Sequence, residues 1–403
     1  MKRHVWSLAL AVVLCTLLAG SGWAVAAAAA SAGGAAEALA GEAGGHRYIV
    51  VFRPGLPVAQ QVALARQHGG QVIHQLGLVN ALAVEFPGAV PRALAGHPGV
   101  ARVEVDARAF ALARKPPAQP AQQVPWGVDR IDADLAWASS RGAGIKVAVV
   151  DTGIDKDHPD LLANLKGGYL AIQTGAYKNK GPDAWDDDNG HGTHVAGIVA
   201  AVDNAIGVVG VAPEAWLYGV KVLDRSGSGY YSDIIEGIQW CIDNGMQVIN
   251  MSLGGSTDSP ALHDAIIAAY NRGITVVCAA GNEGPGEDTV AYPARYPEVI
   301  AVAATAADDS VPDFSSRGPE VDIAAPGVSI LSTWKGGGYA TASGTSMASP
   351  HVAGTVALYL AARGPASPDQ VRQHLMATAE PLPYPSTWVG AGLVDAQAAV
   401  SSR

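Results

Sequence analysis

The sequence predicts an α/β protein in which a doubly wound, mainly parallel sheet follows a small α+β domain of ferredoxin-like topology. From about Gln122 onward, short apolar runs alternate with longer segments of helical periodicity, as in a parallel sheet with helices on both faces. Before that point, residues 46–112 contain six candidate elements in the order β-α-β-β-α-β. Residues 115–120 carry three prolines, which neither a helix interior nor a central strand tolerates, so a domain boundary is expected there.

The first residues have the parts of a secretory signal. Lys2 and Arg3 form a basic start, Val5–Leu18 is an apolar run, and an alanine-rich stretch follows. A membrane anchor is the alternative, but the apolar run is shorter than the roughly 20 residues that span a bilayer. We therefore expect residues 1–32 to be a signal peptide, and the protein to be secreted into the extracellular space without a stable membrane anchor.

Residues 46–112 form the expected small domain. Its pattern predicts a strand at Arg47–Arg53, a helix at Val58–His68, two strands within Gln71–Phe86, a short helix at Val90–Ala95 and a strand at Val100–Val105. Residues 113–121 then form a proline-rich linker or the mature N-terminus. Residues 122–403 form the large domain.

The large domain alternates strands with helices. Apolar runs predict strands at Ile145–Asp151, Trp216–Val222, Gln247–Met251, Thr275–Ala279 and Val299–Ala303. Helical spacing predicts helices at Gly192–Ala201, Ser232–Asn244, Pro260–Arg272, Ser346–Ala362 and Pro368–Ala377. Ligands of doubly wound sheets bind at the carboxyl ends of the strands, so polar residues that follow these strands are the first candidates for a site.

The charge of the chain argues against nucleic acid as a main partner. The formal net charge is -10, whereas phosphate binding requires a basic face. Residues 46–112 hold six Lys and Arg against three Asp and Glu, and residues 113–403 hold 18 against 31. These opposite balances favour docking of the small domain on the large one, with chance asymmetry as the alternative.

Three cysteines are too few for a disulfide framework. Cys15 lies in the signal segment, and Cys241 and Cys278 both have apolar neighbours. We predict two buried free thiols, with a disulfide between Cys241 and Cys278 as the alternative that export would permit.

Two motifs at strand and helix ends carry groups that can do chemistry. Asp151 closes an apolar strand before Thr152 and Gly153, where it can be a turn residue or a catalytic acid. The second Asp-Thr-Gly or Asp-Ser-Gly that an aspartic protease needs is absent from the sequence. His191 and His194 have the i, i+3 spacing of a metal pair, but no third ligand stands at matched spacing. We therefore expect one catalytic and one structural histidine.

Ser346 lies in the first turn of a long apolar helix. A helix N-terminus offers free backbone N–H groups and stabilises negative charge, as a serine nucleophile requires when an oxyanion forms. Capping of the helix is the alternative role, and Ser343 and Ser349 fit it equally well. Asn282 follows another buried strand, where it can supply a second N–H donor to an oxyanion or be an ordinary turn residue.

Together the four motifs resemble those of the subtilisin-type serine proteases. They are Asp-Thr-Gly at 151–153, His-Gly-Thr-His-Val-Ala-Gly at 191–197, Ala-Ala-Gly-Asn-Glu-Gly at 279–284 and Gly-Thr-Ser-Met-Ala-Ser-Pro-His-Val-Ala-Gly at 344–354. The resemblance extends from Val124 to Ala396, and residues 46–112 resemble the family's inhibitory prodomain. It implies a secreted, monomeric endopeptidase that acts on proteins and peptides. Its precursor would cleave itself near Leu112, and its own prodomain would act as an intramolecular inhibitor.

The resemblance also implies a role for each site residue. Ser346 attacks the scissile carbonyl, His191 transfers the proton, Asp151 orients the imidazole, and Asn282 contributes to the oxyanion hole. Substrate would contact Gly227, Ser228, Gly229, Ser252, Leu253, Gly254, Ala280, Gly281 and Glu283. Small pocket walls predict broad specificity with an apolar bias, and Glu283 would tolerate a basic group.

Two other functions compete with this interpretation. An inactive pseudoprotease would lack one of the four main residues, and none is missing. A processing enzyme for a few partners often carries a further C-terminal domain, whereas this chain stops soon after Asp395.

Calcium is the cofactor that the resemblance implies. The stronger site would use Gln122, Asp160, Val202, Asn204, Ile206 and Val208, and its amide, carbonyl and carboxylate oxygens suit a hard cation. The alternative is that Asn204 and Gly207 merely form a turn. A weaker site would combine Asp322 with the carbonyls of Ala294 and Tyr296.

Overall fold

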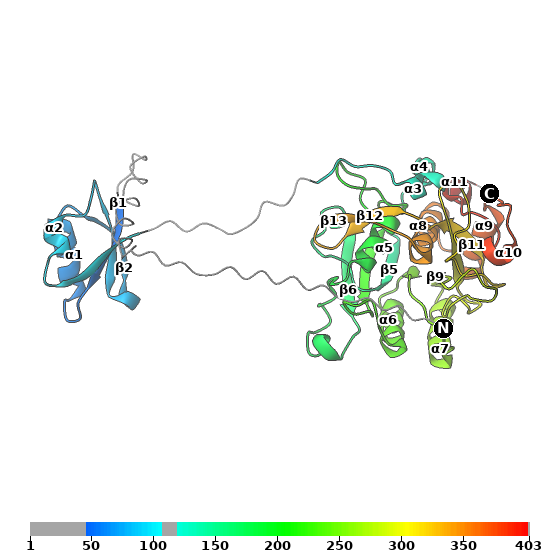
Figure 1. The fold of residues 1–403 in the computed structure, drawn as a ribbon, viewed down its shortest axis with the longest axis horizontal. Helices are drawn as coiled ribbons and strands as arrows, with labels where there is room; N and C mark the ends of the chain where they lie inside the picture. Colours follow the sequence, from blue (N-terminus) through cyan, green and yellow to red (C-terminus); the bar gives the residue numbers. More distant parts are fainter. Residues whose placement is uncertain (1–45, 107–118, 402–403) are drawn as a thin grey trace, which may run out of the picture. The chain divides into compact units, whose positions relative to one another are not determined.

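The computed structural model describes residues 46–106 and 119–401. The chain divides between Lys115 and Pro116 into two compact units, each described here by itself (Figure 1). The predicted signal peptide and the predicted cleavage near Leu112 lie outside the described residues. Among the helices of the described residues, none is long and apolar enough to cross a membrane.

The small unit is an antiparallel sheet with two helices. Its elements are β1 (His46–Phe52), α1 (Val58–Gln67), β2 (Gln71–Leu76), a 3-10 turn (Gly77–Val79), β3 (Ala81–Phe86), α2 (Arg92–Ala95) and β4 (Val100–Val105). The strand order β2-β3-β1-β4 places β1 and β3 in the centre, and their Val50, Leu82 and Val84 pack with Ala65 of α1 and Leu94 of α2. The element order that the sequence predicts is confirmed.

The large unit is built on seven parallel strands. They are β5 (Lys146–Asp151), β6 (Leu165–Leu170), β7 (Trp216–Lys221), β8 (Val248–Met251), β9 (Thr275–Ala279), β10 (Ile300–Thr305) and β11 (Ile323–Pro326). Their order is β11-β10-β9-β8-β5-β7-β6, and every neighbouring pair is parallel. The sequence pattern missed β6 and β11, the two edge strands. Gly167 and Gly168 interrupt the first, and the second has only four residues and ends in Pro326.

Side chains of the central strands alternate between two cores, as the pleat of a strand requires. In β5, Val147 and Val149 enter one core, whereas Ala148 and Val150 enter the other. The first core lies beneath α5 (His191–Ala200), α8 (Thr345–Arg363) and α11 (Ala396–Ser401), and the second beneath α6 (Tyr231–Asp243) and α7 (Pro260–Asn271). Helices therefore cover both faces of the sheet (Figure 1), which confirms the doubly wound prediction.

Smaller elements complete the large unit. They are α3 (Trp126–Arg130), α4 (Ala133–Ala136), a 3-10 turn (Gly175–Tyr177), β12 (Ile330–Trp334), β13 (Gly338–Ala342), α9 (Pro368–Ala377) and α10 (Ser386–Val389). Cys241 and Cys278 are free and fully buried in the second core, as predicted, and burial raises the pKa of both thiols.

Candidate active site

The carboxyl end of β5 and the start of α5 bring Asp151 and His191 together. Asp151 is the last residue of β5 and is fully buried, with one carboxylate oxygen held by the Thr152 backbone N–H at 2.7 Å. Gly192 permits the close approach of α5, because a Cβ atom there would lie 2.1 Å from the Gly153 carbonyl oxygen. His191, the first residue of α5, therefore faces Asp151 directly.

The imidazole of His191 is held by the buried carboxylate. Its Nδ1 lies 2.8 Å from Oδ1 and 2.9 Å from Oδ2 of Asp151, and the His191 side chain is about 30% exposed. Burial alone would lower the pKa of His191, but the charge and hydrogen bond of Asp151 raise it above its ordinary value. The ring nitrogen Nε2 is thereby left for exchange of a proton.

Ser346 lies in the first turn of α8, half-buried, and its hydroxyl donates to the carbonyl of Ser252 at 3.2 Å. The other two candidate serines are placed differently. Ser349 is fully buried against the Ser252 hydroxyl at 2.9 Å, and the Ser343 hydroxyl accepts from the Ser329 backbone N–H at 2.8 Å. Of the three, only Ser346 lines a cavity beside the strand ends.

Asn282 follows β9 and is oriented by the residue before Ser346. Its Oδ1 accepts from the backbone N–H of Thr345 at 2.9 Å and from the Thr345 hydroxyl at 3.1 Å. Among the described residues, neither the Asn282 Nδ2 nor the Ser346 backbone N–H donates a hydrogen bond to another group. Both donors remain available where Asn282 and Ser346 line the same cavity.

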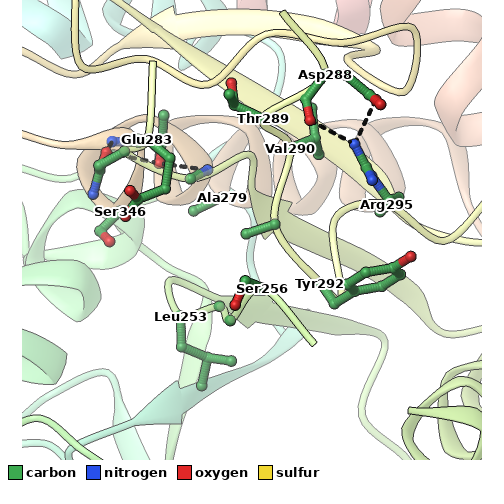
Figure 2. Close-up of a pocket in the computed structure, with 16 residues that line it drawn as sticks. Leu253, Ser256, Ala279, Glu283, Asp288, Thr289, Val290, Tyr292, Arg295 and Ser346 are labelled. Atoms are coloured by element: carbon green, nitrogen blue, oxygen red, sulfur yellow. Dashed lines mark hydrogen bonds and ion pairs between the residues drawn. The ribbon is translucent and has the colours of Figure 1, made fainter. Parts of the chain in front are cut away.

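This cavity, called the Ser346 cavity below, has a volume of about 530 Å³ (Figure 2). The predicted contacts Leu253, Gly254, Gly281 and Glu283 line it, as does Ala279. Ala280 was predicted as a wall residue but is fully buried and does not line the cavity. Seven wall residues lie outside the sequence motifs and were missed: Gly255, Ser256, Asp288, Thr289, Val290, Tyr292 and Arg295.

A second cavity of about 500 Å³ contains His191. It is lined by both predicted substrate-binding segments, Gly227-Ser228-Gly229 and Ser252-Leu253-Gly254. Leu253 and Gly254 line both cavities, so the two adjoin, and together they are called the cleft below. The carboxyl ends of β5, β7 and β8 thus meet where the sequence placed the site.

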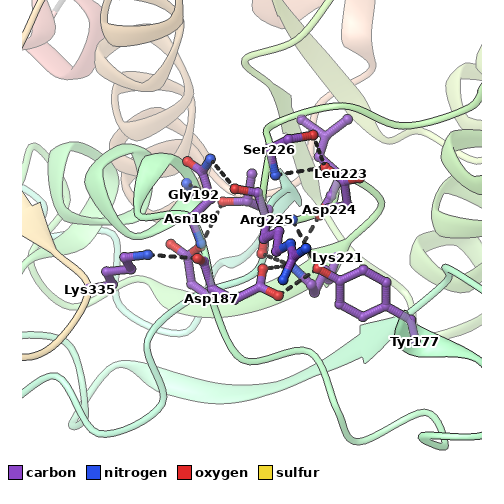
Figure 3. A network of polar contacts seen from close by, with 12 residues as sticks. Tyr177, Asp187, Asn189, Gly192, Lys221, Leu223, Asp224, Arg225, Ser226 and Lys335 are labelled. Carbon is purple, nitrogen blue, oxygen red and sulfur yellow. Dashed lines mark hydrogen bonds and ion pairs between the residues drawn. The ribbon is translucent and has the colours of Figure 1, made fainter. Parts of the chain in front are cut away.

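Behind this cleft lies a buried lysine that the sequence motifs did not indicate. Lys221, the last residue of β7, is fully buried and donates to the carbonyls of Thr152 at 2.5 Å and Leu223 at 3.1 Å (Figure 3). Its third contact is Oδ1 of Asp188 at 2.6 Å, three residues before His191. One ammonium group therefore joins the turn after Asp151, the segment before Gly227 and the loop before His191.

His194 is the structural histidine that the sequence predicts. It is fully buried, its Nε2 lies 3.1 Å from the Ile330 carbonyl and 3.0 Å from that of Ala340, and burial lowers its pKa to about 4. In the described part of the chain, no three His, Cys, Asp or Glu side chains are grouped as metal ligands. The two histidines make different contacts, since His191 Nδ1 faces Asp151 whereas His194 Nε2 faces two backbone carbonyls.

The six residues of the stronger calcium prediction come together around one loop. The buried Asp160 carboxylate accepts from Asn204 Nδ2 at 2.7 Å and from the Val208 N–H at 2.9 Å, and Gln122 Oε1 accepts from the Asn204 N–H at 2.5 Å. The carbonyls of Val202, Ile206 and Val208 accept no hydrogen bond from any described residue. Unpaired carbonyls beside a buried carboxylate form a donor set that suits a hard cation.

The weaker predicted cation position is different. Asp322 Oδ1 accepts from Arg372 Nε at 2.9 Å and from Nη2 at 2.5 Å, and its Oδ2 accepts from the Ala301 N–H at 2.9 Å. The guanidinium of Arg372 therefore already balances the charge of this carboxylate.

Comparison with known proteins agrees with this geometry. Residues 142–396 match the model of the subtilase family. The chain is 45% identical over 361 residues to subtilisin E of Bacillus subtilis, covering 88% of this chain and 90% of that protein. It is 49% identical over 284 residues to a subtilisin of Bacillus pumilus, covering 69% of this chain and 99% of that protein. It is 43% identical over 330 residues to an alkaline protease of Alkalihalobacillus alcalophilus, covering 82% of this chain and 81% of that protein. The chain therefore belongs to the subtilase family and is a serine endopeptidase of the subtilisin type.

Proposed function

We propose that Ser346 is the nucleophile of this endopeptidase, with His191 as its general base and Asp151 as the group that orients the imidazole. The paired contacts between His191 Nδ1 and the Asp151 carboxylate carry the proposal, because they leave Nε2 toward the cleft. The Ser346 hydroxyl donates to the Ser252 carbonyl, so it would have to rotate toward His191 before attack. His191 then takes the hydroxyl proton and later gives it to the leaving amine.

The oxyanion of the tetrahedral intermediate would be held by two donors. Thr345 fixes the amide oxygen of Asn282, so the Nδ2 group keeps one orientation, and the Ser346 N–H is supplied by the N-terminus of α8. Donors fixed before the reaction need no reorganisation when charge develops on the carbonyl oxygen.

We propose that substrate binds as an extended strand between Gly227–Gly229 and Ser252–Gly254. Recognition through backbone groups ignores most side chains, which supports broad specificity. The side chain before the scissile bond would enter the Ser346 cavity, whose volume of about 530 Å³ takes a large apolar group. A peptide library should show cleavage after large apolar residues in preference to acidic ones, and equal cleavage after both would contradict this assignment.

We further propose that the protein is secreted as a precursor and that residues 46–112 assist folding and inhibit the enzyme. The basic balance of this segment and the acidic balance of the rest support docking between them. The experiment compares the full chain with Ser346→Ala by intact mass. The native chain should release its N-terminal segment near Leu112, whereas the variant should stay intact. If the Ser346→Ala variant still releases its N-terminal segment with no other protease present, the proposed role of Ser346 is wrong.

We propose calcium only for the first donor set. Asp160 would supply the charge, Gln122 and Asn204 amide oxygens, and Val202, Ile206 and Val208 backbone carbonyls. A bound calcium would hold the segment at Gln122 to the loop that follows α5, and it supplies no chemistry to the reaction. The second set is left out because Arg372 already pairs with Asp322.

A further inference from the structure

One wall of the Ser346 cavity lacks support from any helix or strand. The segment from Glu283 to Thr289 contributes Glu283, Asp288 and Thr289 to the lining, and most of it is exposed. Exposed segments without regular structure move unless side chains elsewhere hold them. The width of the cavity therefore depends on what fixes this wall.

Arg317 contacts this wall at two places. Its Nη1 donates to the Pro285 carbonyl at 3.1 Å. Its backbone N–H donates to the Thr289 hydroxyl at 3.0 Å, and its carbonyl accepts from the Thr289 N–H at 2.8 Å. A single residue that is only 7% exposed thus binds the middle and the end of the wall segment.

Trp388 of α10 provides the platform for the Arg317 side chain. The guanidinium carbon lies 3.4 Å from the centre of the indole ring, and the Gly318 N–H donates to the Thr387 carbonyl at 2.8 Å. Trp388 packs on the second core, so the platform belongs to the rigid body of the unit. A planar guanidinium stacks on an aromatic face, whereas a lysine ammonium cannot reproduce that contact.

We infer that Arg317, stacked on Trp388, is a positioning residue that sets the width of the pocket for the residue before the scissile bond. The inference rests on the proposed function of the Ser346 cavity. Substitution of Arg317 would remove the side-chain bond to the Pro285 carbonyl, whereas its backbone bonds to Thr289 and the pairing of Arg295 with Asp288 would remain. The part of the segment around Pro285 would then move away, and a large side chain would lose part of one enclosing wall. A small side chain would not reach that wall. Asn282 is held separately by Thr345, so the reaction step itself should be preserved.

The experiment measures kcat and KM for two peptides that differ only in Phe or Ala before the scissile bond. Arg317→Met should raise KM for the Phe peptide about tenfold, keep kcat within about twofold, and leave the Ala peptide unchanged. Trp388→Leu should also raise KM for the Phe peptide. Trp388→Phe should keep most of the native preference for the Phe peptide over the Ala peptide, because it keeps an aromatic face under Arg317. Arg317→Lys should have a KM for the Phe peptide between that of the native enzyme and that of Arg317→Met.

Arg130→Met is the matched control, because Arg130 also joins distant segments by pairing with Asp309 and Glu380 but does not line the cavity. It should lower the melting temperature without changing the Phe-to-Ala ratio. An equal change for both peptides in the Arg317 variants, or an unchanged ratio, would overturn the inference. If Arg317→Met fails to fold, the same ratio in Arg317→Lys and Trp388→Leu decides the question. A native enzyme that cleaves neither peptide and resists a serine-directed acylating reagent would instead overturn the proposed function.

Discussion

At the scale of single residues, the Asn282 side chain is oriented by its neighbour Thr345. An asparagine in a loop can turn either end of its amide toward a cavity. Two hydrogen bonds from Thr345 to Oδ1 hold the oxygen end on α8, and they leave the nitrogen end free. A donor fixed in this way stabilises an oxyanion better than a mobile one.

Asn282→Ala should lower kcat by about 10² to 10³-fold with little change in KM, a magnitude known for such donors in this family. Thr345→Val should cause a smaller loss, because Asn282 keeps the backbone donor but loses the hydroxyl. Steady-state kinetics on one peptide substrate measure both effects. Asn244→Ala, at the exposed end of α6, is the control that should change neither constant. A rise in KM at unchanged kcat would contradict the oxyanion role.

The pH dependence also belongs to a single residue. A histidine acts as a base only when it is neutral, and the charge and hydrogen bond of Asp151 together outweigh burial and raise the pKa of His191 above its ordinary value. With His191 as the proposed base, kcat/KM should be low below this raised pKa and rise as the pH increases through it. Asp151→Asn removes the charge that raises the pKa of His191. Activity should therefore fall about 10⁴-fold, and the activity that remains should appear at a lower pH than in the native enzyme. Melting temperatures across the same pH series separate titration from unfolding, and an acidic optimum would refute the assignment.

At the scale of elements, Lys221 joins the loop before α5 to the two segments that follow the paired strands β5 and β7. It lies at the end of β7, and its contacts reach the turn after β5, the start of the substrate segment and the loop before α5 (Figure 3). Among residues 46–106 and 119–401, Lys221 is the one donor to the carbonyls of Thr152 and Leu223.

Lys221→Met should destabilise the protein by about 3 kcal/mol, since a buried carbonyl left without a donor costs about 1–3 kcal/mol. Asp188 adds little to this figure because it is half-exposed and water screens its charge. Urea unfolding of an inactive Ser346→Ala background measures the change without self-digestion. Lys335→Met is the matched control, because Lys335 is exposed and donates to the backbone carbonyl of Asp188. Equal stability of the two variants would show that the buried contacts contribute nothing.

At the scale of the whole molecule, the Gln122 segment meets a loop some 80 residues later in the chain. Backbone bonds join Gln122 to Ala205 and Gln123 to Gly207, and Asp160 lies beneath them. A cation among these groups would connect three distant parts of the large unit.

Removal of calcium should lower the melting temperature. Binding at a free concentration of 100 times the dissociation constant stabilises by about 2.7 kcal/mol, which is about 5–10 °C for a unit of this size. Differential scanning calorimetry of the Ser346→Ala variant with and without chelator measures the shift. Asp160→Ala should lose the dependence on calcium, whereas an unchanged native melting temperature would reject the site.

Much of the architecture follows from local patterns in the sequence. Continuous apolar runs identified five of the seven strands, because buried parallel strands need apolar side chains on both faces. The edge strands β6 and β11 escaped because glycines and a proline interrupt their patterns. The small unit was predicted with its complete element order, because its turns at Gly77 and Asn80 interrupt the apolar pattern.

What the sequence by itself determined is the inventory of chemical groups: Asp151, His191, Asn282 and Ser346 at strand and helix ends, in the order typical of the family. The tertiary structure alone decided what surrounds them. It showed Ala280 buried behind the wall, Lys221 beneath the cleft, Arg372 against Asp322 and Arg317 on Trp388. Local periodicity reports which face of an element is buried, but contacts between residues far apart in the chain depend on how the elements pack, and no local pattern encodes them.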